Sequence, residues 1–137
     1  AIVTTSGRTA VSALLEQLLP QHHVQLQLWV CGEDVAAKKP DPEAYRLAVR
    51  ELKLPPERVL AIEDSANGLA AAHDAGLAVL VTRSAASAAE PAEAFTLASA
   101  QVTHLGDRDH PCAVLNGPAC PEGYVTLSYL KQLLPSG

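Results

Sequence analysis

The sequence predicts an α/β domain built on a doubly wound, Rossmann-like parallel sheet. Continuous apolar runs at residues 59–62 and 77–81 are typical of strands that are buried on both faces. Amphipathic stretches at residues 11–19 and 42–52 are typical of helices. Because the two kinds of element alternate along the chain, they favour parallel strands joined by crossover helices.

Composition predicts one domain that spans residues 1–137. The chain has 48% hydrophobic residues and a net charge of -5, which is an ordinary balance for a globular protein. A nucleic-acid partner is not expected, because phosphate-backbone binding needs clustered Lys and Arg. No stretch has the length of a membrane span or the pattern of a signal peptide, so a cytoplasmic location and no membrane partner are expected.

The first third of the chain predicts two strands around one helix. Residues 1–5 form a β-branched run that becomes polar, which indicates a strand and its exit loop. Apolar residues then recur at helical spacing over 11–19, and Pro20 ends that helix. Residues 28–30 predict a second short strand. Because residue 1 already lies in an apolar strand, we expect this chain to be a fragment of a longer protein.

The middle of the chain carries clear helix boundaries. Asp41 followed by Pro42 predicts a capped helix start. Residues 68–75 predict an Ala-rich helix between the two buried strands, and Gly76 occupies the left-handed position that ends it.

The C-terminal part, residues 84–137, has weaker patterns. Residues 85–100 predict a loop and then a short helix, and residues 106–124 are rich in Gly and Pro and predict irregular structure. Residues 125–134 predict a closing amphipathic helix. We therefore expect the chemistry in residues 1–83.

Three polar clusters follow the predicted strands, at the edge where open α/β sheets bind ligands. They are Thr4-Thr5-Ser6-Gly7-Arg8, Lys38-Lys39-Pro40 and Glu63-Asp64-Ser65-Ala66-Asn67-Gly68. The hydroxyls and amides of the first cluster suit an anion, although caps and turns use the same residues. Lys39 could neutralise phosphate oxygens, or it could be a solvated loop lysine.

The adjacent carboxylates of Glu63 and Asp64 are the most informative pair. They repel each other unless a cation or hydrogen bonds compensate. Mg²⁺ binds hard oxygen ligands and usually needs only one or two protein carboxylates besides phosphate and water. The alternative is that one of the two acids caps the following helix.

In this order, the three clusters resemble the second, third and fourth motifs of the haloacid dehalogenase superfamily. The resemblance is strongest to the branch of beta-phosphoglucomutase and phosphoglycolate phosphatase. The matching stretches are Ala1-Ile2-Val3-Thr4-Thr5-Ser6, Lys39-Pro40-Asp41-Pro42-Glu43-Ala44-Tyr45 and Ile62-Glu63-Asp64-Ser65-Ala66-Asn67-Gly68.

The resemblance implies roles for seven residues. Substrate binding falls to Thr4, Thr5, Ser6, Arg8 and Lys39. Thr4 and Lys39 would also be catalytic, with Thr4 bonded to the transferring phosphoryl group and Lys39 bridging phosphate and nucleophile. Glu63 and Asp64 would hold Mg²⁺.

The resemblance also implies that the first motif, Asp-x-Asp, is absent from this chain. In the family it lies on the central strand and precedes a helical cap, and both would lie upstream of Ala1. Asp107-Arg108-Asp109 has the same spacing, but it follows a glycine instead of an apolar strand and predicts an exposed loop. We expect the core to be incomplete and inactive alone, with its own N-terminal segment as a partner.

The implied function is a Mg²⁺-dependent phosphatase that acts on a small phosphorylated metabolite or sugar phosphate through a phospho-aspartyl intermediate. One alternative is a phosphomutase, which transfers the phosphoryl group to a sugar hydroxyl. The other is a truncated relative without catalytic activity.

Overall fold

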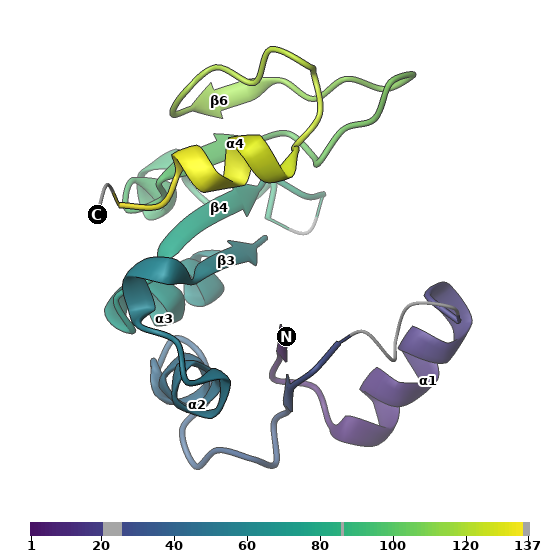
Figure 1. Ribbon diagram of the computed structural model, residues 1–137, viewed down its shortest axis with the longest axis vertical. Coiled ribbons are helices and arrows are strands. Elements are labelled where there is room, and N and C mark those ends of the chain that lie inside the picture. The colour runs from purple at the N-terminus through teal and green to yellow at the C-terminus, as the bar shows by residue number, and fades with distance from the viewer. Residues whose placement is uncertain (21–25, 86, 136–137) are drawn as a thin grey trace.

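The computed structural model describes residues 1–20, 26–85 and 87–135 of an α/β protein (Figure 1). A parallel pair of strands forms one small sheet, and four further strands form a second sheet in the order β3-β4-β5-β6. The strands are β1 (Ile2–Val3), β2 (Trp29–Val30), β3 (Leu60–Glu63), β4 (Ala78–Thr82), β5 (Ala100–Val102) and β6 (Val114–Asn116). At the edge of the second sheet, β6 is antiparallel to β5, whereas β3, β4 and β5 run parallel. The predicted α/β class with a mainly parallel sheet is confirmed.

The helices begin within three residues of the predicted positions. They are α1 (Arg8–Leu18), α2 (Glu43–Leu52), α3 (Ala66–Asp74) and α4 (Leu127–Gln132), with single 3₁₀ turns η2 (Pro56–Arg58) and η3 (Ala92–Phe95). Gly76 has a φ of 83°, as its predicted left-handed position requires. In the described ranges, no helix has the length and apolar character needed to cross a membrane.

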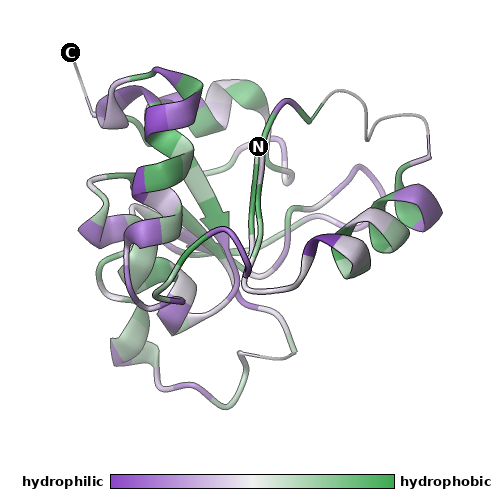
Figure 2. Ribbon diagram, turned by 90° about the horizontal axis from the view of Figure 1, so that it is seen from below, coloured by the Kyte–Doolittle hydropathy of each residue, from purple (hydrophilic) through white to green (hydrophobic). Residues whose placement is uncertain are grey.

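Helices cover both faces of the four-stranded sheet. Along β4, Val79 and Val81 point into a core that α2 and α3 share, whereas Leu80 points to the opposite face. There it meets Tyr129 of α4. Figure 1 shows α4 crossing one face of the sheet, and in Figure 2 the strands are mostly green while the helices carry both colours. Because side chains alternate along a strand, one apolar run supplies both cores.

The C-terminal part is more regular than predicted. Two strands, β5 and β6, extend the sheet in this part of the chain, for which no strand was predicted. The 3₁₀ turn η3 lies where a short helix was expected, and α4 matches the expected closing helix. β5 is three residues long and contains Gln101, whose side-chain amide donates to the Phe95 carbonyl at 2.9 Å. Such a short strand with a central polar residue has no recognisable pattern in sequence.

The apolar stripe of α1 is only partly buried. Val11 and Leu15 pack against Cys31 and the small sheet. Leu14 and Leu18, which continue the stripe, are 55% and 64% exposed. The helix therefore rests on the sheet along one narrow line.

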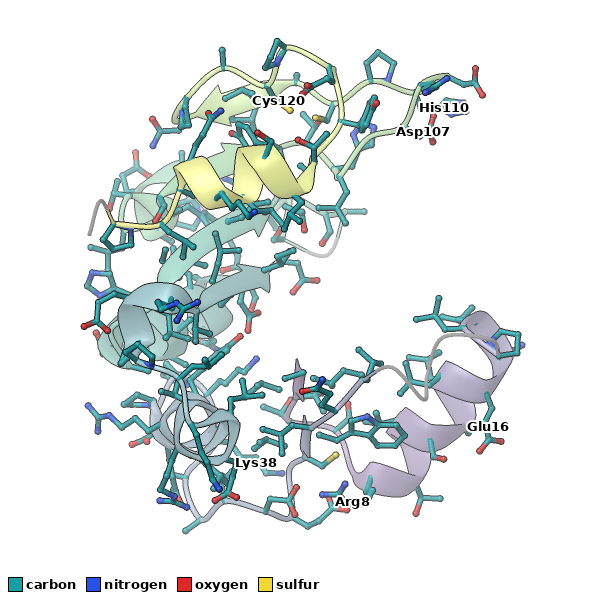
Figure 3. The ribbon with its side chains drawn as sticks, in the orientation of Figure 1. Arg8, Glu16, Lys38, Asp107, His110 and Cys120 are labelled. Atoms are coloured by element: carbon teal, nitrogen blue, oxygen red, sulfur yellow. The ribbon has the colours of Figure 1, made fainter. Side chains whose placement is uncertain are left out.

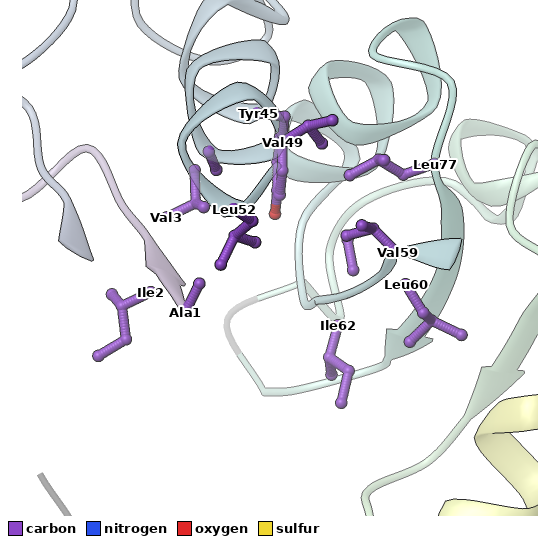
Figure 4. Close-up of a pocket in the computed structure, with 12 residues that line it drawn as sticks. Ala1, Ile2, Val3, Tyr45, Val49, Leu52, Val59, Leu60, Ile62 and Leu77 are labelled. Atoms are coloured by element: carbon purple, nitrogen blue, oxygen red, sulfur yellow. The ribbon is translucent and has the colours of Figure 1, made fainter. Parts of the chain in front are cut away.

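A cavity separates the two sheets. β1 and β3 belong to different sheets and are not paired with each other in the part of the chain that the structure describes. The cavity between them has a volume of about 450 Å³, and its walls include Val3, Tyr45, Val49 and Ile62 (Figure 4). The strands that carry the first and third polar clusters thus face each other across this space.

Candidate active site

A polar pocket lies at the carboxyl ends of β1 and β3. It encloses about 410 Å³ and is lined by Val3, Thr4, Thr5, Lys39, Ile62, Glu63, Asp64, Ser65 and Asn67. All three polar clusters contribute to it, although their residues are far apart in the sequence. The edge of the sheet brings them together because parallel strands end on the same side.

Lys39 connects the three segments. Its ammonium donates to the Val3 carbonyl of β1 at 2.9 Å and forms an ion pair with Glu63 of β3. The side chains of Lys39 and Glu63 are only 11% and 9% exposed, so solvent screens their attraction weakly. Lys39 is therefore fixed beside the pocket and is no freely solvated lysine.

Tyr45 completes this cluster from α2, and sequence reasoning missed it. Its hydroxyl donates to Glu63, and its ring centroid lies 4.8 Å from the Lys39 ammonium. Burial, followed by the charge of Glu63 and the hydrogen bond to it, raises the pKa of the Tyr45 phenol above its ordinary value. The sequence placed Tyr45 on the apolar face of the helix, and no pattern showed where its hydroxyl would point.

The first cluster is split between two hollows. Thr4 and Thr5 line the polar pocket, and the Thr4 hydroxyl accepts from the Ser6 amide at 3.1 Å. Ser6 lines a separate, more apolar hollow beside α1 that Val11 and Leu14 also line. Of the three predicted hydroxyl contacts, the structure places Thr4 and Thr5 in the pocket.

Arg8 is held by acidic residues of the loop after β2. Its guanidinium forms a 2.6 Å ion pair with Asp34, and its backbone amide donates to Glu33 at 2.8 Å. The Glu33 carboxylate thus accepts a hydrogen bond from an amide at the N-terminus of α1. The sequence predicted that such amides would bind an anionic ligand. Arg8 does not line the polar pocket, and Figure 3 shows it beside the start of α1.

The third cluster divides its tasks among neighbouring residues. Ser65 caps α3, because its hydroxyl accepts from the Gly68 amide at 3.1 Å. The alternative that Glu63 or Asp64 caps this helix is therefore wrong. Glu63 faces Lys39 and Tyr45, whereas Asp64 is exposed at the pocket.

Gly68 leaves the space that the Glu63 carboxylate needs. A Cβ atom built at this buried glycine would overlap both carboxylate oxygens of Glu63. We expect Gly68→Ala to destabilise the protein by about 1–3 kcal/mol, because either the helix or the ion pair must shift. Urea unfolding of the whole protein measures this change. Gly7→Ala is the control, since its Cβ would lie at an ordinary 3.6 Å from Glu33. Equal unfolding midpoints for the two variants would contradict the prediction.

The acidic triplet Asp107-Arg108-Asp109 lies in an exposed loop, as predicted. Asp107 and His110 are exposed at the tip of a loop (Figure 3). The backbone amides of His110 and Asp109, with lesser help from nearby histidines, lower the pKa of the Asp107 carboxyl. This carboxylate closes a tight turn.

The pocket offers a partial ligand set for a divalent cation. In the described ranges, no group of three or more His, Cys, Asp or Glu side chains gathers around one point. Asp64 presents a hard carboxylate to the pocket, while the charge of the adjacent Glu63 is balanced by Lys39. One such carboxylate fits Mg²⁺, which takes most of its remaining ligands from water and phosphate.

Comparison with known proteins identifies similar chains. Residues 1–76 match the hydrolase family described as haloacid dehalogenase-like hydrolase. Protein CbbY of Cereibacter sphaeroides is 45% identical over 84 residues, which is 60% of this chain and 36% of that protein. The Phosphorylated carbohydrates phosphatase of Thermotoga maritima is 46% identical over 48 residues, or 35% of this chain and 22% of that protein.

A solved structure has the same fold. CbbY from Rhodobacter sphaeroides in complex with xylulose-(1,5)bisphosphate superposes with a TM-score of 0.69 and 38% identity. The match covers 76% of this chain and 47% of the CbbY chain. This chain thus spans less than half the length of the relatives that it matches.

Proposed function

Because this chain belongs to the haloacid dehalogenase-like hydrolase family, we propose that it is part of a Mg²⁺-dependent phosphatase. The substrate is a small phosphorylated metabolite such as a sugar phosphate. This choice is supported by two similar proteins, one named for phosphorylated carbohydrates and one crystallised with xylulose bisphosphate. The observation that carries the proposal is the position of Lys39, which stands in one pocket with Thr4 and Asp64.

In this proposal Thr4 and Lys39 act on the phosphoryl group directly. The Thr4 hydroxyl and the Thr5 segment donate hydrogen bonds to its oxygens, and Lys39 supplies a fixed positive charge. Positioning and electrostatic stabilisation provide most of the catalysis in phosphoryl transfer, so a pre-placed ammonium lowers the barrier. Ser6 and Arg8 lie outside the pocket. They are left with a supporting role in holding the Thr4 loop and the start of α1.

Asp64, with Glu63 beside it, holds the magnesium ion in this proposal. A bound Mg²⁺ would neutralise charge that develops on the phosphate oxygens. Asp64 is the more direct ligand because Glu63 is already paired with Lys39. The two acids therefore serve different cations at one edge of the sheet.

The attacking group is not among the residues of this pocket. We propose that an aspartate outside residues 1–137 forms the phospho-aspartyl intermediate, which water then hydrolyses. A strand between β1 and β3 would bring it to the pocket, and the cavity there gives such a strand room. Residues 1–137 alone are then inactive.

The test is hydrolysis of a generic aryl phosphate by the whole protein that carries this chain. We expect activity that requires Mg²⁺, disappears when a chelator removes the ion and returns when Mg²⁺ is restored. Residues 1–137 alone serve as the control and should release no phosphate. Hydrolysis that is unaffected by the chelator, or none at any Mg²⁺ concentration, would contradict the proposal.

A further inference from the structure

Tyr45 makes a set of contacts that a core tyrosine does not need. Its side chain projects from α2 into the space between Val3 and Ile62 (Figure 4), and the residue is only 6% exposed. The ring packs among apolar residues of the main core. Its hydroxyl nevertheless donates to the Glu63 carboxylate, next to the Lys39 ammonium.

Within the residues that the structure describes, the Lys39 ammonium has one N–H donor that is not firmly bonded to the protein. An ammonium has three N–H donors. Two of them go to the Val3 carbonyl and to Glu63. The third N–H can donate to the Tyr45 hydroxyl oxygen, but the Lys39 Nζ to Tyr45 Oη distance is 3.5 Å, so this hydrogen bond is long and weak. This donor can therefore turn to an anion in the pocket at small cost.

The hydroxyl also shares the charge of Glu63. A carboxylate that accepts only from Lys39 would draw the ammonium toward itself and cancel much of its field at the pocket. Because Tyr45 donates to the same oxygen of Glu63, part of the negative charge is satisfied from α2. The ring face of Tyr45 beside the ammonium further limits how far Lys39 can move.

We propose that Tyr45 is a positioning residue of this site, which holds the Lys39–Glu63 pair so that one ammonium donor stays free for a phosphate oxygen. The inference rests on the proposed function and deepens it. Tyr45 does not contact the anion itself. It affects anion binding through the position of Lys39.

The test compares Tyr45→Phe with Tyr129→Phe in the whole protein. Both changes remove one buried hydroxyl, since Tyr129 is 1% exposed and donates to the Pro118 carbonyl at 3.1 Å. Tyr129 belongs to α4, lies in the other core and does not line the pocket. Both variants should lose stability, so a change in phosphate binding or Lys39 reactivity that occurs in Tyr45→Phe alone is an effect on the active site.

Two measurements are made on each variant. In the aryl phosphatase assay we expect Tyr45→Phe to raise KM by roughly tenfold, with a smaller change in kcat, as for one lost hydrogen bond to a charged group. Acetylation of lysine amines by acetic anhydride, followed by mass spectrometry, reports Lys39 without any turnover. Its rate relative to the exposed Lys38 should fall several-fold in Tyr45→Phe, because Glu63 then holds the ammonium more tightly, and it should stay at the wild-type value in Tyr129→Phe.

The outcomes separate this proposal from the phosphatase activity. An inactive whole protein in which Tyr45→Phe still lowers the reactivity of Lys39 would overturn the phosphatase and keep Tyr45 as the residue that holds the ion pair. An active protein in which Tyr45→Phe and Tyr129→Phe share the wild-type KM and Lys39 reactivity would overturn the role of Tyr45. Equal changes in both variants would also overturn it, because they reduce Tyr45 to a core residue.

Discussion

Replacing Lys39 by Met is expected to lower the kcat/KM of the whole protein for an aryl phosphate by on the order of 10²- to 10³-fold. Met keeps the length and the apolar stem of the side chain, so the substitution removes mainly the charge and its donors. The Glu63 carboxylate, 9% exposed, then loses the cation that balances it. Removing one partner of a buried pair costs roughly 3–5 kcal/mol, so the unfolding midpoint in urea should fall as well.

The matched control is Lys38→Met. Lys38 is adjacent in the sequence and exposed, and we expect wild-type kinetics and stability from it. The double variant Lys39→Met with Glu63→Gln separates the two effects, because it removes the uncompensated charge without restoring the ammonium. It should recover much of the lost stability and none of the activity. Recovery of activity in the double variant would contradict the role of Lys39.

Replacing Asp64 by Asn is expected to change how the enzyme depends on Mg²⁺. The amide has the shape of the carboxylate but carries no charge, and Mg²⁺ strongly prefers charged oxygen ligands. We expect the Mg²⁺ concentration for half-maximal activity to rise by on the order of 10²-fold. Loss of a residue that only supports a metal ligand already lowers metal affinity by about 10- to 100-fold, and Asp64 is proposed as a ligand itself. Because Asp64 is exposed and Ser65 supplies the helix cap, stability should change little.

Asp74→Asn is the control for Asp64→Asn. Asp74 is the last residue of α3, exposed and remote from the pocket, so its variant tests whether any lost negative charge alters the Mg²⁺ titration. The measurement is the initial rate of phosphate release over a range of Mg²⁺ concentrations. Superimposable titrations for wild type and Asp64→Asn would refute Asp64 as a magnesium ligand.

The sequence was sufficient to place Thr4, Lys39 and Asp64 in one pocket. Each follows or precedes an element whose pattern was clear, and the rule that ligands bind at the carboxyl ends of parallel strands then brings them together. The apolar runs at β3 and β4 were equally readable as strands, but only β4 is buried on both faces as expected. In β3 only Ala61 is buried, and Ile62 is 46% exposed. Local patterns were sufficient where one element decides the position of a residue.

Contacts between distant segments were not predictable in this way. Arg8 is turned away from the pocket by Asp34, which lies twenty-six positions later in the chain. The Tyr45 hydroxyl meets Glu63 only because α2 packs beside β3. β5 is a strand because it pairs with β4, while its own three residues carry no strand signal. In each case tertiary packing determines the position of the residue or strand, and local sequence patterns do not predict that packing.

The central claim is that Lys39 holds a phosphoryl group in the pocket that it shares with Thr4 and Asp64. The most direct measurement is calorimetric titration of the whole protein with inorganic phosphate in the presence of Mg²⁺, for the wild type, Lys39→Met and Lys38→Met. The account predicts saturable binding that Lys38→Met retains and Lys39→Met weakens by roughly tenfold or more, as expected for a lost charge-assisted hydrogen bond. Equal phosphate affinity in all three proteins would contradict it.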